Sequence, residues 1–142
     1  MRQNGSRNIY MRRQLLAAAR RGTPEAQYAL ASDYDFGRPR DLERAVRWYR
    51  RAAEQGHGEA QNLLGECLRE GEGAQKSLRE AVHWFRQAAS QNVSDAQVSL
   101  GYAFFYGEGV RRNRSEALRW YQAAAAQGNA SAHLNIGHMF LR

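Results

Sequence analysis

Apolar and polar residues follow a helical period along the chain, and one pattern occurs three times. Residues 45–60, 81–96 and 117–132 read AVRWYRRAAEQGHGEA, AVHWFRQAASQNVSDA and ALRWYQAAAAQGNASA. In the first copy alanine, tryptophan, tyrosine and two further alanines stand at i, i+3, i+4, i+7 and i+8, which is the spacing of one helical stripe. We therefore predict an amphipathic helix in each copy and call it helix B.

A second apolar stripe precedes each of these helices and occurs once more near the end of the chain. Residues 24–34, 58–68, 94–104 and 130–140 each place an alanine, an aliphatic residue, a small residue and a bulky residue at i, i+4, i+5 and i+8. We call this predicted element helix A. Glycine inside a helix costs about 1 kcal/mol relative to alanine, so we expect the small position to serve close helix packing. Its occupants are Ala31, Gly65, Gly101 and Gly137.

Residues typical of helix ends occur at fixed places in the repeat. Glycine and asparagine tolerate the left-handed conformation that ends many helices, and one repeat position holds Gly22, Gly56, Asn92 and Gly128. Serine, asparagine and aspartate are good N-caps, and Asp41, Ser77 and Asn113 precede the three helices B. Ser77 with Glu80 also matches a capping box. We therefore expect short, well-terminated helices.

The two helices together form a repeat of about 36 residues. Trp48, Trp84 and Trp120 are separated by 36 and 36 residues. A unit of this length cannot bury its apolar face alone, so the repeat predicts stacking of neighbouring units. We expect an all-α solenoid of stacked antiparallel helix pairs, with a half repeat at 11–22, repeats at about 23–56, 57–92 and 93–128, and a final helix at 129–142.

Positive charge is concentrated at the N-terminus. The 142-residue chain has a net charge of +7, and residues 1–22 contribute six arginines and no acidic residue. This predicts a basic and flexible arm over residues 1–10. The arm is a second candidate binding surface. Binding of nucleic acid or another anionic surface is the alternative function, although a nucleic-acid binder typically spreads its basic residues along a folded face. The candidate residues are Arg2, Arg7, Arg12 and Arg13.

Residues suited to catalysis or metal binding are sparse. Cys67 is the only cysteine, which excludes an intramolecular disulfide and fits a reducing, cytoplasmic location. His133 and His138 are five residues apart and so do not share a helical face. The sequence has no His-Glu-x-x-His motif, no nucleophile elbow and no apolar run of about eighteen residues. We expect no enzyme activity, cofactor, metal or membrane span.

The repeated residues carry a family resemblance. Residues 96–128 spell most fully the pattern AQ…LG…F…G-x-GV…EAL-x-WY-x-AAA-x-G, which resembles the Sel-1-like repeat, a relative of the tetratricopeptide repeat. The resemblance covers roughly residues 11–142. It implies a right-handed superhelix with helices A on the concave side and a role in binding other proteins as an adaptor or scaffold. Bacterial members include inhibitors or immunity proteins for effectors. Some members have a disulfide in each repeat, which this sequence lacks.

Specific recognition is expected at positions that differ between repeats. By analogy with tetratricopeptide repeats, the concave positions lie two before, two after and five after the aliphatic residue of helix A. The first half of the predicted groove is polar, whereas the second half is aromatic and aliphatic, as in binding hot spots. Packing against a neighbouring helix is the alternative role for some of them. The positions are Tyr28, Ser32, Asp35, Asn62, Glu66, Arg69, Val98, Tyr102, Phe105, Leu134, His138 and Leu141.

The last predicted helix has more apolar residues than one packed face can use. Leu134, Ile136, Met139, Phe140 and Leu141 fall within eight positions. Terminal solenoid repeats normally have a polar outer face. The pattern therefore predicts that a partner protein covers this helix, that it self-associates, or that the chain is truncated.

The three tryptophans are predicted to belong to the core. We therefore expect Trp84→Ala to lower the free energy of unfolding by about 3–5 kcal/mol, as measured by chemical denaturation. Equal stability of the variant and the parent would contradict the core assignment.

Overall fold

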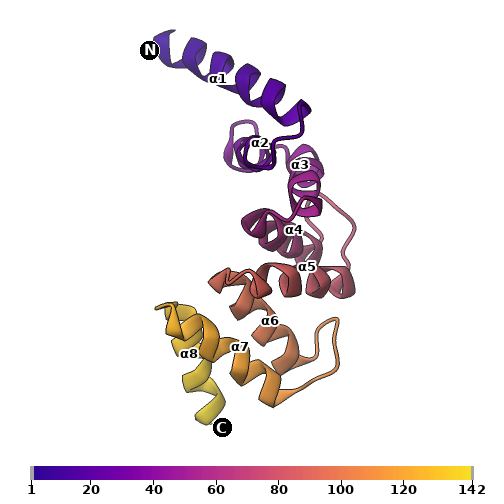
Figure 1. Cartoon of the computed structure of the whole chain (residues 1–142), viewed down its shortest axis with the longest axis vertical. Helices are drawn as coiled ribbons and strands as arrows, with labels where there is room; N and C mark the ends of the chain where they lie inside the picture. Colours follow the sequence, from indigo (N-terminus) through magenta and orange to yellow (C-terminus); the bar gives the residue numbers. More distant parts are fainter. Residues whose placement is uncertain (1, 142) are drawn as a thin grey trace.

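The protein is a stack of helices. The computed structural model describes the backbone of residues 2–141 and the side chains of residue 5 and residues 8–141. Within residues 2–141 there are eight α-helices and no strand, and the helices follow one another in chain order from end to end (Figure 1). The predicted all-α solenoid is confirmed. The helices are α1 (Arg2–Arg20), α2 (Pro24–Phe36), α3 (Leu42–Glu54), α4 (Gly58–Glu70), α5 (Leu78–Ser90), α6 (Ser94–Tyr106), α7 (Arg114–Ala126) and α8 (Ala130–Phe140).

Helix α1 differs from its predicted start. The sequence pattern predicted a helix only from residue 11, whereas α1 begins at Arg2, so the segment expected as an arm is helical. Its second half packs on α2 through Leu15, Leu16 and Ala19. In its first half, Ile9 and Tyr10 are 59% and 64% exposed. The sequence of residues 2–10 carries no apolar stripe from which a helix could be predicted.

The predicted helix ends are present. The four residues after the helices B have positive φ angles, at +95°, +90°, +67° and +83°. The side chains of Asp41, Ser77 and Asn113 each accept a hydrogen bond from the backbone N–H three residues later. The capping box is only half formed, because Glu80 does not return a bond to Ser77. Its carboxylate instead pairs with Arg50 at 2.6 Å.

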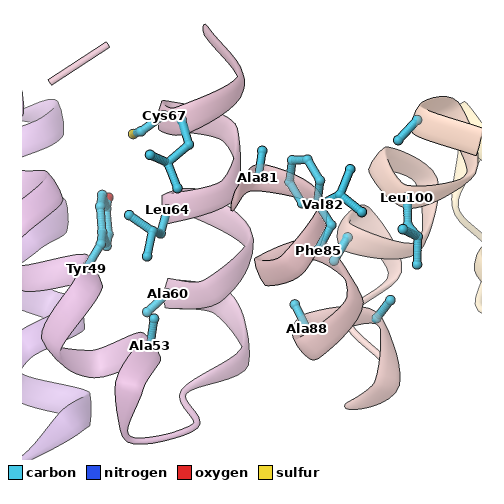
Figure 2. Close-up of a cluster of buried hydrophobic side chains, with 14 of the residues drawn as sticks. Tyr49, Ala53, Ala60, Leu64, Cys67, Ala81, Val82, Phe85, Ala88 and Leu100 are labelled. Carbon is cyan, nitrogen blue, oxygen red and sulfur yellow. The ribbon is translucent and has the colours of Figure 1, made fainter. Parts of the chain in front are cut away.

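The buried aromatic residue of each helix B is the one that follows the tryptophan. Tyr49, Phe85 and Tyr121 are at most 2% exposed, and Figure 2 shows Tyr49 and Phe85 on either side of α4. The tryptophans at the preceding positions are only half-buried and pack at the edge of the core. The expectation that the tryptophans are the buried core residues is therefore corrected. The stripe is centred on the following residue, which leaves the indole at the rim.

In the second and third repeats the buried aromatic ring lies directly against the small residue of its helix A. A Cβ atom added at Gly65 would lie 2.6 Å from a ring carbon of Phe85, and one at Gly101 would lie 2.7 Å from the ring of Tyr121. These distances confirm that the small position permits close packing. At Gly137 nothing lies within 4 Å, and α8 is the last helix among the described residues.

A ladder of glutamines connects successive repeats. In three helices A a buried glutamine donates from Nε2 to the carbonyl oxygen of an alanine in the last turn of the preceding helix B, at 3.1–3.2 Å. Its Oε1 accepts from a second glutamine that follows the next helix B, at 2.8–3.0 Å. The Nε2 and Oε1 atoms of the buried glutamine thus each have a hydrogen-bond partner, as buried polar groups normally do. The three pairs are Gln27 with Gln55, Gln61 with Gln91, and Gln97 with Gln127.

The difference in burial changes the stability expected of two neighbouring variants. Phe85→Ala removes a fully buried ring and should lower the free energy of unfolding by about 3–5 kcal/mol. Trp84→Ala removes a half-buried ring and should cost less, about 1–3 kcal/mol. Urea denaturation of both variants checks this order. A larger loss at Trp84 than at Phe85 would contradict the assignment of the core.

Two glycines at the same repeat position are expected to respond in opposite directions. Gly101→Ala forces the ring of Tyr121 to move and should destabilise the protein by about 1–3 kcal/mol. Gly137→Ala meets no atom and should stabilise α8 by up to about 1 kcal/mol through helix propensity. Thermal unfolding followed by circular dichroism measures both. The same sign of change in the two variants would contradict the close-packing role.

Candidate protein-binding groove

Three consecutive helices A line one hollow of the surface. It has a volume of about 620 Å³ and brings together five of the residues predicted for the concave face, which come from α4, α6 and α8. We call this hollow the A-helix groove, and these five residues are Arg69, Val98, Tyr102, Leu134 and His138. Its remaining lining comes from the same helices, from the start of α5 and from two loops: Glu70, Lys76, Leu78, Glu108, Ser131 and Asn135.

Helical spacing places the two apolar walls of this groove. Val98 and Tyr102 are four residues apart on α6, and Leu134 and His138 are four residues apart on α8, so each pair shares one face of its helix. Tyr102 is 37% exposed and Leu134 is 67% exposed. The ring of Tyr102 rests on that of Tyr106, with 4.5 Å between the ring centroids. The groove therefore offers a supported aromatic ring opposite an exposed aliphatic side chain.

Charges of both signs lie at the edge next to α4. Arg69 pairs with Glu70 at 3.2 Å, and its guanidinium lies 5.9 Å from the ring centre of Phe85. Lys76 comes from the loop between α4 and α5, and Glu108 comes from the loop between α6 and α7. This edge can donate to carboxylates or carbonyl groups and can accept from amides, so it suits a polypeptide more than a ligand of one charge.

Glu66 lies one turn before this charged edge and is half-buried. Burial raises the pKa of Glu66 above its ordinary value of 4.5, and the positive charge of Arg69 acts against this rise. Helix α4 therefore holds a carboxyl group whose charged form is disfavoured, and Glu66 is not among the residues that line the A-helix groove.

Other predicted groove residues lie beside the hollow. Phe105 lines a smaller hollow with Tyr121 and Met139, and His138 belongs to both. Tyr28 stacks on the ring of His57, with 4.6 Å between centroids. Leu141 follows α8 and is 84% exposed, but it does not line the A-helix groove.

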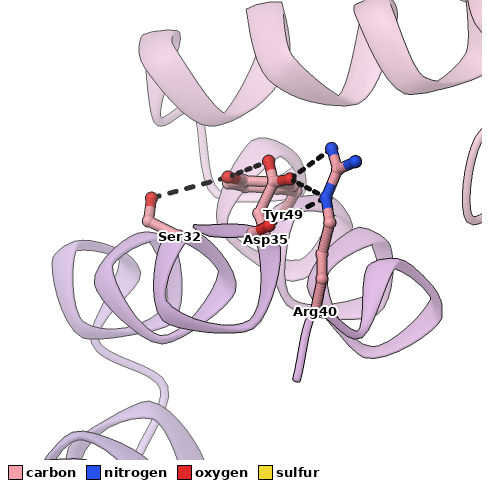
Figure 3. Close-up of polar contacts among 4 residues, drawn as sticks. All are labelled: Ser32, Asp35, Arg40 and Tyr49. Carbon is pink, nitrogen blue, oxygen red and sulfur yellow. Dashed lines mark hydrogen bonds and ion pairs between the residues drawn. The ribbon is translucent and has the colours of Figure 1, made fainter. Parts of the chain in front are cut away.

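Asp35 is a structural residue, which corrects its assignment as a partner contact. It is 6% exposed, and its carboxylate accepts from the hydroxyl of Tyr49 at 3.0 Å and from Arg40 at 3.0 Å (Figure 3). The hydroxyl group of Ser32 lies 3.5 Å from that of Tyr49. Burial raises the pKa of Tyr49 well above its ordinary value, so the phenol keeps its proton for this bond. The polar first half of the predicted groove is thus partly used inside the fold.

Asn62 is also buried, at 6% exposure, which corrects its assignment as an open groove position. Its Oδ1 has no hydrogen-bond partner among the described residues. The neighbouring repeats hold Tyr28 and Val98 at this position. The repeat position alone therefore does not determine exposure.

One of the arginines predicted for the basic arm contacts helix α2. Arg12 donates to Asp33 at 2.5 Å, and its guanidinium lies 4.8 Å from the ring centre of Tyr34. Arg13 is exposed on α1. The side chains of Arg2 and Arg7 lie outside the described ones.

Sequence reasoning missed the loop residues of the groove. Lys76 and Leu78 precede α5 or begin it, and Glu108 follows α6, so they lie outside the helix A register from which the concave positions were predicted. The feature of the sequence that could have indicated these residues is the length of the loops after α4 and α6, because these loops reach the edge of the groove. Loop conformation, unlike helical spacing, is not fixed by a simple period.

The described residues also bear on metal binding and membrane insertion. Among the described side chains, no three histidine, cysteine, aspartate or glutamate residues come together in a group that could hold a metal ion. No described helix combines the length and the apolar character needed to cross a bilayer. Burial raises the pKa of the Cys67 thiol to about 11, which keeps it protonated at neutral pH.

The stacked helix pairs and the groove along the helices A define a helical-repeat protein, and comparison gives its family. The Sel1 repeat matches residues 24–57, 58–93 and 94–129, which is more than half of the chain. These repeats begin one residue later than the predicted ones. The chain belongs to the Sel1 repeat family, as its sequence pattern suggested. No curated protein matches it significantly.

Solved structures resemble the chain closely. A protective antigen of uropathogenic Escherichia coli that displays an SLR fold is 40% identical, with a TM-score of 0.85 over 89% of this chain and 27% of its own. A Sel1 repeat protein from Oxalobacter formigenes is 33% identical, with a TM-score of 0.80 over 87% of this chain and 51% of its own. The chain therefore spans only about a quarter to a half of these two relatives.

A more distant structure shares the fold. Cysteine-rich protein B of Helicobacter pylori is 22% identical, with a TM-score of 0.69 over 85% of this chain and 93% of its own. This chain has a single cysteine, which is buried and free. The helix stacking seen here therefore needs no disulfides.

The half-buried carboxyl group of Glu66 leads us to predict that wild type and a Glu66→Gln variant differ in stability by an amount that depends on pH. Because the folded-state pKa is raised, the free energy of unfolding falls as pH rises from the ordinary value through the raised one. Glu66→Gln removes this loss, so it should melt higher than wild type at neutral pH, and the gain should shrink on acidification. Thermal melts between about pH 3 and about pH 8 measure it.

Glu54→Gln, at an exposed site on α3, is the matched control and should show little change over this range. A lower melting temperature for Glu66→Gln at neutral pH would contradict the inferred burial penalty, as would a difference that is independent of pH.

Proposed function

We propose that this protein is a protein-binding module that takes a segment of a partner in the A-helix groove. The observation that carries the proposal is the meeting of Arg69, Tyr102 and Leu134 in one hollow, although they come from three different helices A. These positions differ between repeats, whereas the residues that stack the helices are repeated. A surface whose residues differ between repeats, on a scaffold whose packing residues are the same in each repeat, is suited to recognition.

The chemistry of the groove indicates what kind of segment it would take. Exposed aromatic and aliphatic residues dominate the binding energy of many interfaces when a partner side chain inserts between them. Tyr102 and Leu134 provide such a place, and the charged edge formed by Arg69 and Glu108 can bond the partner backbone or its polar side chains. We infer a segment with an apolar anchor residue next to polar groups.

The family supports a binding role rather than catalysis. Sel1 repeat proteins form a class of helical-repeat scaffolds, and the family generally mediates protein–protein interaction. A non-enzymatic adaptor, scaffold or inhibitor is the finer role that we propose. Because the relatives from Escherichia coli and Oxalobacter formigenes are longer than this chain, the activities of those whole proteins are not transferred to it.

The groove is tested by site-specific cross-linking in the native cell. A photoreactive phenylalanine analogue in place of Tyr102 should capture a partner, and the same analogue in place of Phe36 should not. Phe36 is a suitable control because it is 75% exposed and lies outside the groove. Leu134→Ala should weaken capture from the Tyr102 site by about tenfold, the loss of one hot-spot side chain. Mass spectrometry of the cross-linked product identifies the partner.

Three outcomes separate this proposal from the others. Capture that survives Leu134→Ala unchanged contradicts the groove. Loss of binding on deletion of residues 1–9, without any effect of Leu134→Ala, assigns binding to the basic N-terminus instead. Cross-linking of the chain to itself, with light scattering that shows a concentration-dependent dimer, assigns the exposed apolar residues of α8 to self-association. An inhibitor is distinguished from an adaptor because it abolishes the activity of the captured protein.

A further inference from the structure

A second hollow is lined by residues of α1, α2 and α3. These three helices form the N-terminal end of the solenoid (Figure 1). It has a volume of about 380 Å³, and four arginines and two aromatic residues form most of its wall. We call it the arginine pocket, and these six residues are Arg20, Arg44, Arg47, Arg51, Tyr34 and Trp48. It shares no residue with the A-helix groove, and none of its lining residues is acidic.

Helical spacing brings the arginines to one place. Arg44, Arg47 and Arg51 stand at i, i+3 and i+7 and therefore share one face of α3. Arg20 comes from the last turn of α1, one turn after Leu16, which also lines the pocket. Two helices thus direct positive charge at the same volume.

Aromatic rings support the guanidinium groups. Arg51 lies 4.7 Å from the ring centre of Trp48, and Arg44 lies 5.8 Å from that of Tyr34. Stacking on an aromatic face holds the planar guanidinium while leaving its N–H groups able to donate at the edge. These donors are arranged before any ligand binds, which lowers the entropy cost of binding a carboxylate.

Much of this charge has no partner among the described residues. Arg44 approaches Asp41 at 3.6 Å, but Arg20, Arg47 and Arg51 make no ion pair with any described residue. Helix α1 contains no acidic residue. Close positive charges repel one another, and an anionic ligand would relieve this repulsion.

Two of the four arginines of the pocket are not required by the repeat. The position of Arg44 holds Glu80 in the second repeat and Glu116 in the third. The position of Arg51 holds Gln87 and then Ala123. The later repeats fold without these arginines, so packing alone does not account for them.

We propose that the arginine pocket binds an acidic peptide segment of a partner protein, with carboxylates flanking an apolar side chain. Arginine donors match the planar carboxylate, and Leu16 with the aromatic rings offers an apolar contact between them. Nucleic acid fits less well, since base stacking needs open aromatic faces. Guanidinium groups cover one face of Tyr34 and of Trp48, and both rings also pack against the core.

The test is a titration of the whole chain with a fluorescent peptide of glutamates around one leucine, followed by anisotropy at low salt. Arg51→Gln and Arg44→Glu introduce residues that the later repeats already have, so the fold should persist. Each should weaken binding by about threefold to tenfold, as loss of a charge-assisted pair predicts. Added salt should weaken binding to wild type.

Arg119→Gln is the matched control. Arg119 occupies the position of Arg47 in the third repeat and lies 5.6 Å from the ring centre of Trp120, but Glu116 is 3.5 Å away from it. This variant and Tyr102→Ala should leave peptide affinity unchanged, which separates the arginine pocket from the A-helix groove. Circular dichroism melts confirm that all variants are folded.

The proposal is overturned by any of three results. The peptide fails to bind wild type, or binds all variants equally. Arg119→Gln loses as much affinity as Arg51→Gln, which assigns the attraction to overall charge. Oligothymidylate binds more tightly than the peptide and depends on the same arginines, which assigns the pocket to nucleic acid.

Discussion

The contact between the buried aromatic ring of helix B and the small residue of its helix A, seen at Phe85 and Tyr121, is the constraint on which the structure depends. At Gly65 and Gly101 there is no room for a Cβ atom beside the ring. This contact sets how closely the two helices approach, and its repetition keeps the helices A in a regular row. The groove lies along this row, with Tyr102 on α6 and Leu134 on α8.

Polar groups inside the stack join the repeats and also decide which surface is available. The glutamine ladder links each repeat to the next through satisfied amides, so the links add specificity without unpaired buried groups. In the first repeat, Tyr49 and Arg40 take up the carboxylate of Asp35. That carboxylate is therefore not offered to a partner. Open binding surface is left mainly over α6 and α8, where Tyr102 and Leu134 are exposed.

Charge separates the two candidate surfaces. The A-helix groove has both signs at its edge, with Arg69 paired to Glu70, whereas the arginine pocket has three arginines without an ion pair among the described residues. A mixed, partly apolar groove favours shape and apolar contact, and a pocket of one sign favours carboxylates. The groove is lined from α4, α6 and α8 and the pocket from α1, α2 and α3, and these two sets of helices occupy different parts of the stack (Figure 1). One partner with two segments, or two partners, could use both.

The sequence by itself determined the helices, their ends, the repeat and the family, because these depend on local spacing, on residues such as Gly128 that accept positive φ, and on caps such as Ser77. Only the tertiary structure decided burial. Adjacent residues on a helix differ by about 100° in direction, so a period cannot say whether Trp84 or Phe85 faces the next helix. Burial of Asp35 and the meeting of arginines from α1 and α3 likewise depend on neighbours distant in sequence.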